Sequence, residues 1–182
     1  MIKSRKKVNS KNYCKKRSHN KSHKKKSRAV LHAGAVLHAN ADNITGKIKF
    51  IQKGNKTSIN YHINGLSDGE HGFHIHKNGD LSDGCASACE HFNPFRKKHG
   101  GLNSKDHHAG DLGNIISSNG LSKGIIYSKD ISLRPCDINS ILGRMIIIHE
   151  DPDDLGKGEN EESLKTGNAG KRVACGVIGI VE

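Results

Sequence analysis

Short apolar runs separated by turn residues dominate the chain from residue 29 onward. Within most runs hydrophobic and polar side chains alternate, which is the period of a β-strand with one buried face. Glycine, asparagine and aspartate interrupt the runs where tight turns need them. With no convincing helical periodicity, the pattern predicts eight strands, at 29–40, 44–52, 57–65, 71–77, 111–118, 122–129, 143–150 and 172–182.

This succession of short strands predicts an all-β fold. The chain has 182 residues, enough for one domain with a substantial hydrophobic core. Many short strands joined by turns are typical of antiparallel sandwiches and barrels. We therefore expect an eight-stranded antiparallel barrel or sandwich over residues 29–182.

Two long polar segments interrupt the strand pattern, at 78–110 and 151–171. Both are rich in glycine, and we expect neither to hold a strand or a helix. Loops of this length in a compact domain are usually functional or disordered. The first segment carries several histidines, which indicates that something other than an apolar core orders it.

Charge is distributed unevenly along the chain. Residues 1–28 contain thirteen Lys or Arg and no acid, whereas residues 29–182 contain seventeen Lys or Arg and eighteen acids. The net charge of +12 therefore belongs to the tail, residues 1–28, and does not indicate a nucleic-acid-binding body. We expect this tail to be disordered, because it has too little apolar surface to offset chain entropy. It is either a solvated tail, a nuclear address or a tether for polyanions.

Targeting signals are weak. The tail has no apolar segment like that of a secretion signal, and no window is long enough to span a membrane. We expect a cytoplasmic protein without membrane contact, while nuclear or organellar targeting by the tail stays open. Heavy use of Lys, Asn and Ile is typical of AT-rich coding DNA, which would suit a viral genome and a host cytoplasm.

The cysteines and the first histidines raise separate questions. Five cysteines without a C-x-x-C pair argue against a zinc finger, and an odd number suits a reducing compartment.

In GFHIH, residues 72–76, strand alternation places His74 and His76 on one face. They are either polar surface or half of a metal site. His149, at the end of an apolar run, adds a third imidazole, and such a nitrogen-rich site suits copper.

A second group of candidate ligands lies in the first long loop. His91, His99 and His108 are followed by Asp111 three residues after the last histidine. Three imidazoles and one carboxylate form a donor set that suits tetrahedral zinc. The remaining histidines outside the tail are interpreted as structural or surface residues, with His71 a buried, hydrogen-bonded side chain.

Longer motifs carry a resemblance to a known family. They are GFHIH…GD from Gly72, GC-x-S-x-x-x-HFNP from Gly84, KHGG from Lys98, H-x-GDLGN from His108, and DDLGKG-x-NEES-x-KTGNAG-x-R-x-ACGVIGI from Asp153. In this order, from about residue 35 to 182, the chain resembles copper/zinc superoxide dismutases. The resemblance implies a Greek-key barrel with two functional loops, one copper and one zinc per subunit, and superoxide as substrate. It also implies antioxidant activity and a homodimer, with the last strand and the Cys85 loop as contact surfaces.

The resemblance also implies residue roles. Copper would be bound by His74, His76, His91 and His149, and zinc by His91, His99, His108 and Asp111, with His91 bridging the metals. Asp153 would link one copper histidine to one zinc histidine and so fix both rings. Arg172 would dock the superoxide anion, and His91 would supply a proton, which makes these two the catalytic residues. Lys165, Thr166, Glu161 and Glu162 would guide the substrate, and Cys85 would form a disulfide with Cys175.

The chain departs from the family pattern in three places. Cys89 and Glu90 stand where relatives usually have Gly-Pro, so Cys89 could compete for the disulfide. The segment 133–144 is about two residues longer than usual, and the basic tail has no counterpart in ordinary cytosolic relatives. Two alternatives stay open: a copper-chaperone domain, which the complete ligand set disfavours, and a nucleic-acid or virion tether in which the barrel is passive.

Overall fold

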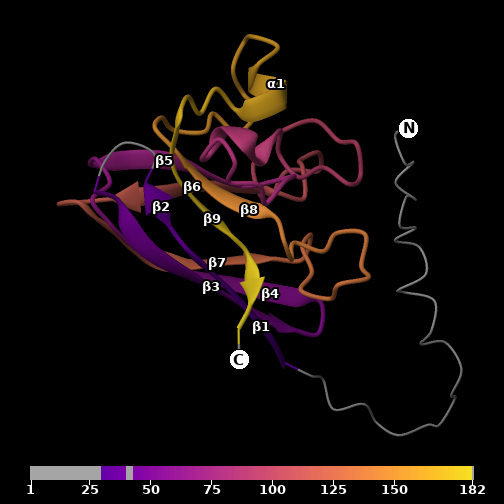
Figure 1. Cartoon of the computed structure of the whole chain (residues 1–182). Coiled ribbons are helices and arrows are strands. Elements are labelled where there is room, and N and C mark those ends of the chain that lie inside the picture. Colours follow the sequence, from indigo (N-terminus) through magenta and orange to yellow (C-terminus); the bar gives the residue numbers. More distant parts are fainter. Residues whose placement is uncertain (1–29, 40–42, 182) are drawn as a thin grey trace, which may run out of the picture.

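The computed structural model describes residues 30–39 and 43–181. The tail, with its expected disorder, lies outside the described residues. Ten strands form two five-stranded antiparallel sheets, with orders β10-β1-β3-β4-β7 and β2-β9-β8-β5-β6 (Figure 1). The strands are β1 Val30–Val36, β2 His38–Ala39, β3 Thr45–Lys53, β4 Lys56–Asn64, β5 Gly69–His76, β6 Asp111–Ser117, β7 Leu121–Ser128, β8 Met145–His149, β9 Arg172–Val177 and β10 Gly179–Ile180. The predicted antiparallel all-β sandwich is confirmed.

The number of strands differs from the eight predicted, because the first and last runs each contribute to both sheets. β1 pairs with β3, whereas β2 pairs with β9 in the other sheet. β9 pairs with β8, whereas β10 pairs with β1. Hydrophobic alternation indicates which face of a strand is buried, but it does not indicate which neighbouring strand supplies the hydrogen bonds. The change of partner could therefore not be predicted from the sequence.

Each long loop contains one short helical turn, which corrects the expectation that neither would hold a helix. A 3₁₀ turn spans Ala86–Ala88, and α1 spans Ser163–Thr166 and ends at Gly167 in the left-handed conformation. Segments of three and four residues are too short to show helical periodicity. Within the described residues, no helix is both long and apolar enough to cross a membrane.

The core lies between the two sheets and fixes the direction in which the histidines of β5 point. Phe73 and Ile75 of β5 are fully buried in the main core, as are Ile146 and Ile148 of β8. Alternate residues of β8 face the other way, into a smaller apolar cluster with Cys85 and Cys175 beneath the first long loop. His74 and His76 therefore project from the outer side of the second sheet, where the loops bury them.

Candidate metal centre

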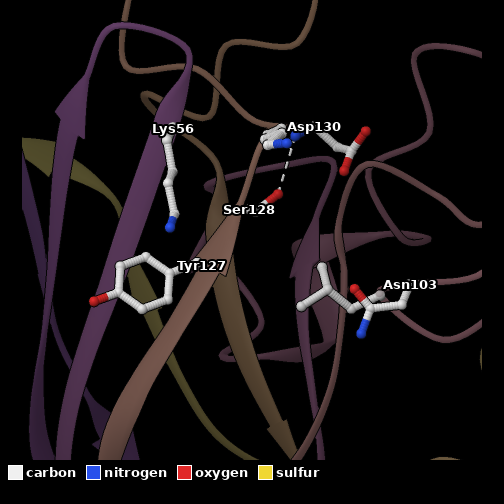
Figure 2. Close-up of a pocket in the computed structure, with 7 residues that line it drawn as sticks. Lys56, Asn103, Tyr127, Ser128 and Asp130 are labelled. Atoms are coloured by element: carbon white, nitrogen blue, oxygen red, sulfur yellow. Dashed lines mark hydrogen bonds between the residues drawn. The ribbon is translucent and has the colours of Figure 1, made fainter.

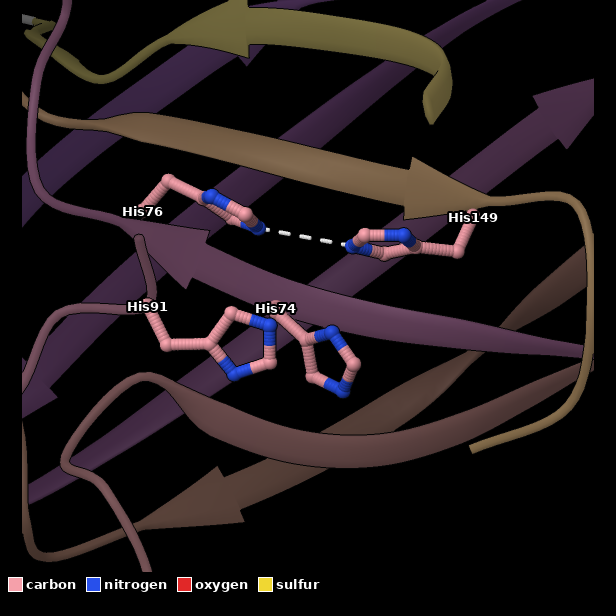
Figure 3. Close-up of side chains that lie close together, drawn as sticks. All are labelled: His74, His76, His91 and His149. Carbon is pink, nitrogen blue, oxygen red and sulfur yellow. Dashed lines mark hydrogen bonds between the residues drawn. The ribbon is translucent and has the colours of Figure 1, made fainter. Parts of the chain in front are cut away.

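Four histidines converge on the outer side of the second sheet (Figure 3). His74 and His76 project from β5, His149 ends β8, and His91 follows in the first loop, where its backbone pairs with that of His76. All four are at most 4% exposed. One ring nitrogen from each lies within 4.8 Å of the others. We call these residues the nitrogen cluster.

The backbone around His76 and His149 fixes the tautomers of both rings. Nδ1 of His76 lies 2.7 Å from the Cys89 carbonyl and Nδ1 of His149 lies 3.2 Å from the Gly170 carbonyl. Because a carbonyl only accepts, each Nδ1 carries the proton. Burial, followed by repulsion from neighbouring histidines, lowers the pKa of both rings far below the usual value. Their Nε2 lone pairs thus face each other at 3.4 Å, an arrangement that a cation between them would stabilise.

A second group of donors surrounds a buried carboxylate at the start of β6. Oδ1 of Asp111 lies 2.9 Å from Nδ1 of His91 and 3.2 Å from Nδ1 of His108, and Oδ2 lies 3.1 Å from Nδ1 of His99. Burial alone would raise the pKa of Asp111, but the three imidazoles close to its oxygens hold it far below the usual value. Asp111 is therefore charged. We call His91, His99, His108 and Asp111 the mixed cluster.

Several inward-facing nitrogens of these clusters have no hydrogen-bond partner. They are Nδ1 of His74, Nε2 of His91, Nδ1 of His99 and Nδ1 of His108. The last two lie close to Asp111 oxygens but without the alignment of a hydrogen bond. Buried polar atoms nearly always have partners. Buried ring nitrogens that converge without hydrogen-bond partners are the arrangement expected of metal ligands, so the donors fit metal ions in both clusters.

Asp153 joins the two clusters from behind. Its Oδ2 lies 2.9 Å from Nε2 of His74 and its Oδ1 lies 2.8 Å from Nε2 of His99. A carboxylate in these contacts accepts N–H protons at Nε2 and so turns each Nδ1 toward its cluster. Burial lowers the pKa of His99, but the close carboxylates of Asp111 and Asp153 outweigh it and raise this pKa to about 9.

Sequence reasoning missed the group that holds Asp153. Asn114 of β6 accepts the Asp153 backbone N–H at 2.7 Å and donates to its carbonyl at 2.9 Å. Asn114 is the last residue of the motif H-x-GDLGN. The motif therefore marked the position, but it gave no indication of what the side chain binds. The Cys89 and Gly170 carbonyls were also missed, because main-chain groups leave no mark on residue type.

Comparisons with known proteins agree on one family. A family model described as copper/zinc superoxide dismutase (SODC) matches residues 44–178. The superoxide dismutase [Cu-Zn] of Paramecium bursaria Chlorella virus 1 is 52% identical over 139 residues, covering 75% of this chain and 73% of that protein. The extracellular superoxide dismutase [Cu-Zn] of Brugia pahangi is 49% identical over 150 residues, covering 80% of this chain and 74% of that protein. The chain belongs to the copper/zinc superoxide dismutase family.

A comparison with solved structures supports the same family, and membership of that family gives the activity of the protein. The crystal structure of the clock protein EA4 matches with a TM-score of 0.78 at 46% identity, covering 83% of this chain and 95% of that chain. As a member of the superoxide dismutase family, the protein is an oxidoreductase that converts superoxide to oxygen and hydrogen peroxide. The antioxidant activity expected from the sequence is therefore confirmed.

Two links tie the first loop of this dismutase to β9. The predicted disulfide between Cys85 and Cys175 is present. Arg172 donates from Nη1 to the carbonyls of Cys85 and Ala86, at 2.8 and 2.9 Å, and from Nη2 to the Cys89 carbonyl. Arg172 also stands opposite His149 in the pairing of β8 with β9. A guanidinium therefore lies beside the nitrogen cluster and stabilises the loop that carries His91.

Two other buried histidines lie near the dismutase's site without joining either cluster. His71 is buried, as predicted, with Nδ1 2.9 Å from the His149 carbonyl and Nε2 2.9 Å from the Ser67 carbonyl. It thereby connects β5 to the end of β8. His107 contacts the Ser104 carbonyl at 2.7 Å and lies outside both clusters.

The expected guidance residues gather at α1 in the second loop. Lys165 lies 3.5 Å from Glu161, and the Thr166 hydroxyl donates to Glu162 at 2.9 Å. The Leu164 carbonyl accepts the backbone N–H of His99 at 2.9 Å, so α1 is fixed directly to the mixed cluster. A side chain at Gly167 would collide with Asp153, which explains the glycine at that position.

Cys89 adopts a backbone conformation that suits glycine. Its φ of 63° and ψ of −152° fall in a region that nearly all other residues avoid, at a cost of about 1–3 kcal/mol. We expect Cys89→Gly to raise the free energy of unfolding by about 1 kcal/mol, after glycine's own entropic cost. Chemical denaturation measures this change. Cys89→Ala removes the exposed thiol but keeps the strain, so an equal gain in that variant would contradict the explanation.

Proposed function

We propose that the nitrogen cluster binds the copper and the mixed cluster binds the zinc, with His91 shared between them. The unpartnered nitrogens of four buried histidines are the observation that supports this assignment. Four imidazoles suit copper, and three imidazoles with one carboxylate suit zinc. When bound, copper supplies a one-electron redox change and zinc supplies a fixed charge without redox chemistry.

His91 holds and releases a proton at Nε2 in this proposal. Its Nδ1 faces Asp111, so Nε2 is the atom left facing the nitrogen cluster. Burial, followed by repulsion from His74, lowers the pKa of His91 to about 3. A proton taken up at such a nitrogen is readily given up, as formation of hydrogen peroxide requires.

Single-ligand variants test the assignment. His76→Ala should lower copper content by at least about tenfold while zinc content stays near one per chain, and His108→Ala should do the reverse. Elemental analysis of the purified full chain measures both metals, and superoxide consumption measures activity. Equal loss of both metals in both variants would contradict the division between clusters.

Arg172 docks the superoxide anion in this proposal. Arg172→Ala should lower the superoxide rate about tenfold at low salt, because the reaction depends on steering an anion to a positive charge. Lys171→Ala removes the same charge from the adjacent exposed residue, which pairs with Glu150, and should change the rate by less than about twofold. Stopped-flow superoxide decay at several salt concentrations measures both rates. Arg172→Lys separates docking from loop support, because lysine keeps the charge but lacks the planar fork of donors that contacts the three carbonyls.

The guidance residues and a homodimer complete the proposal. Lys165, Thr166, Glu161 and Glu162 guide the substrate in this proposal. It is supported by the exposed charges of Lys165 and the two glutamates, which lie on or just before a helix fixed to His99. Two copies associate through the last strand and the Cys85 loop, supported by exposed apolar side chains at Leu81, Ile180 and Val181. Sedimentation equilibrium of the full chain tests the dimer.

Residues 29–182 form the catalytic domain, and residues 1–28 form a separate basic segment that contacts polyanions. We place the enzyme in the cytoplasm, supported by the free, exposed thiol of Cys89, which suits a reducing compartment. Removing residues 1–28 should leave superoxide consumption unchanged. Loss of activity in that variant would contradict the division into two parts.

A further inference from the structure

A lysine-rich face covers the outer side of the first sheet, away from both metal clusters. β3 contributes Lys47, Lys49 and Lys53, β4 contributes Lys56, and β7 contributes Lys123, and all five are exposed. The buried residues of these strands alternate with them, so the five side chains point to the same side. We call these five residues the lysine face.

Strand register arranges the lysine face as a grid. One row across the sheet runs from Lys47 through His62 to Lys123. The next row begins at Lys49, about 6.8 Å farther along β3, and a row at the end of the hairpin places Lys53 opposite Lys56. Like charges placed directly opposite destabilise a sheet. The direct pair of Lys53 and Lys56 is therefore unfavourable for folding, which calls for another explanation of the lysines gathered here.

Acidic residues are missing from the segments that form this face. The sequence has no Asp or Glu in 43–67 or in 112–129. Among the described residues, the ion pairs of lysine involve Lys77, Lys165 and Lys171, and none belongs to the lysine face. Because residues 29–182 as a whole carry seventeen basic and eighteen acidic side chains, the charge of the domain is segregated rather than merely basic.

An exposed aromatic ring lies at one edge of the face. Tyr127 of β7 is 53% exposed, and the Lys56 ammonium stands 4.0 Å from its ring centre (Figure 2). A hollow of about 380 Å³ lies beside them, lined also by Asn103 and Lys129. The carboxylate that lines this hollow, Asp130, lies 3.4 Å from the His107 ring. Cationic and aromatic groups thus stand together at an open surface.

We propose that the lysine face, with Tyr127, binds single-stranded nucleic acid without sequence preference. Lysines bind phosphates as point charges, and exposed aromatic rings stack on bases of any identity. A sheet surface that combines the two is a known way to hold a single strand. Sulfated polysaccharides and anionic membranes would use the lysines but have no base to stack on Tyr127.

The position of the tail supports the same partner. Val30, the first described residue, pairs with Lys53 at the edge of the lysine face. Residues 1–28, with their thirteen basic side chains, are therefore joined to the chain next to this face. The positive charges of the tail and of the lysine face would repel each other, and one polyanion can neutralise both.

Matched charge variants of the full chain test the proposal. The face triple replaces Lys47, Lys49 and Lys123 by glutamine, and the control triple replaces Lys105, Lys157 and Lys171, which are exposed elsewhere. Each triple removes the same net charge and keeps the tail. Fluorescence anisotropy with a labelled oligothymidine of about 20 nucleotides gives the affinity at several salt concentrations. Superoxide consumption verifies that the face triple is folded.

The face triple should reduce the slope of log affinity against log salt by about 2, and the control triple should leave it nearly unchanged. Tyr127→Ala should weaken binding about tenfold without changing the slope, while Tyr127→Phe retains binding. Equal slopes for the two triples would overturn the proposal by assigning all binding to the tail. Discrimination between the triples by heparin or phosphatidylserine vesicles, but not by oligothymidine, would overturn it in favour of another polyanion.

Discussion

Replacing His91 by alanine is expected to lower superoxide dismutation at least about 100-fold and to reduce both copper and zinc content. His91 is the one residue common to the two clusters, with Nδ1 beside Asp111 and an unpartnered Nε2 on the other side. Its removal takes one donor from each cluster, whereas changes at supporting residues typically cost 10–100-fold. Elemental analysis and a superoxide consumption assay on the same preparation measure the result.

His107→Ala is the matched control for this prediction. His107 is similarly buried and lies in the same loop, but it contacts the Ser104 carbonyl outside both clusters. This variant should retain both metals and most of the activity. Retention of copper in the His91 variant, at the level of the unmodified chain, would show that the two clusters do not share this ring.

Removing both metals with a chelator is expected to lower the melting temperature by about 10 °C or more. Without ions, the converging ring nitrogens of the clusters lie buried without partners. An ion that binds only the folded state stabilises that state by about 4 kcal/mol when the free ion concentration is about a thousand times its Kd. For a domain of this size each kcal/mol shifts melting by about 2–4 °C. Differential scanning calorimetry measures the shift.

The mixed cluster should account for most of that stabilisation, because it joins β6 to the first loop and, through His99, to α1. Adding zinc alone to the metal-free chain should therefore restore most of the lost melting temperature. His108→Ala should respond much less to zinc. An unchanged melting temperature after verified metal removal would contradict a structural contribution of the clusters.

Local sequence patterns were sufficient to predict most of the strands, but they predicted little of the structure of the loops. Alternation in β3 and β4 marks buried Phe50 and Ile59 directly, since each strand has one face in the core. β8 already departs from the pattern, because Ile146 and Ile147 are buried on opposite faces. The first long loop is held by the Cys85 disulfide and by the contacts of Arg172, and such long-range links have no periodicity.

The candidate site was predictable to different degrees. Strand alternation alone places His74 and His76 on one side of β5. Their approach to His91 and His149 depends on the tertiary fold. The sequence grouped His149 with them from its place at the end of an apolar run, and it added His91 only through the family resemblance. Asn114 and the carbonyl groups that fix ring tautomers required coordinates, because hydrogen bonds to the main chain are nearly independent of residue type.

The two-layer architecture places the lysine face and the histidine clusters on opposite sides of the protein, farther apart than charges act strongly in salt solution. The two histidine clusters lie outside the β5–β8 layer, and the five lysines lie outside the β3–β4 layer, with a packed apolar interior about 10 Å thick between them. Mobile ions in the surrounding water screen charges over about 8 Å at physiological salt. An enzyme anchored by its lysine side would therefore keep admitting negatively charged radicals on the other side at nearly the rate of the free enzyme.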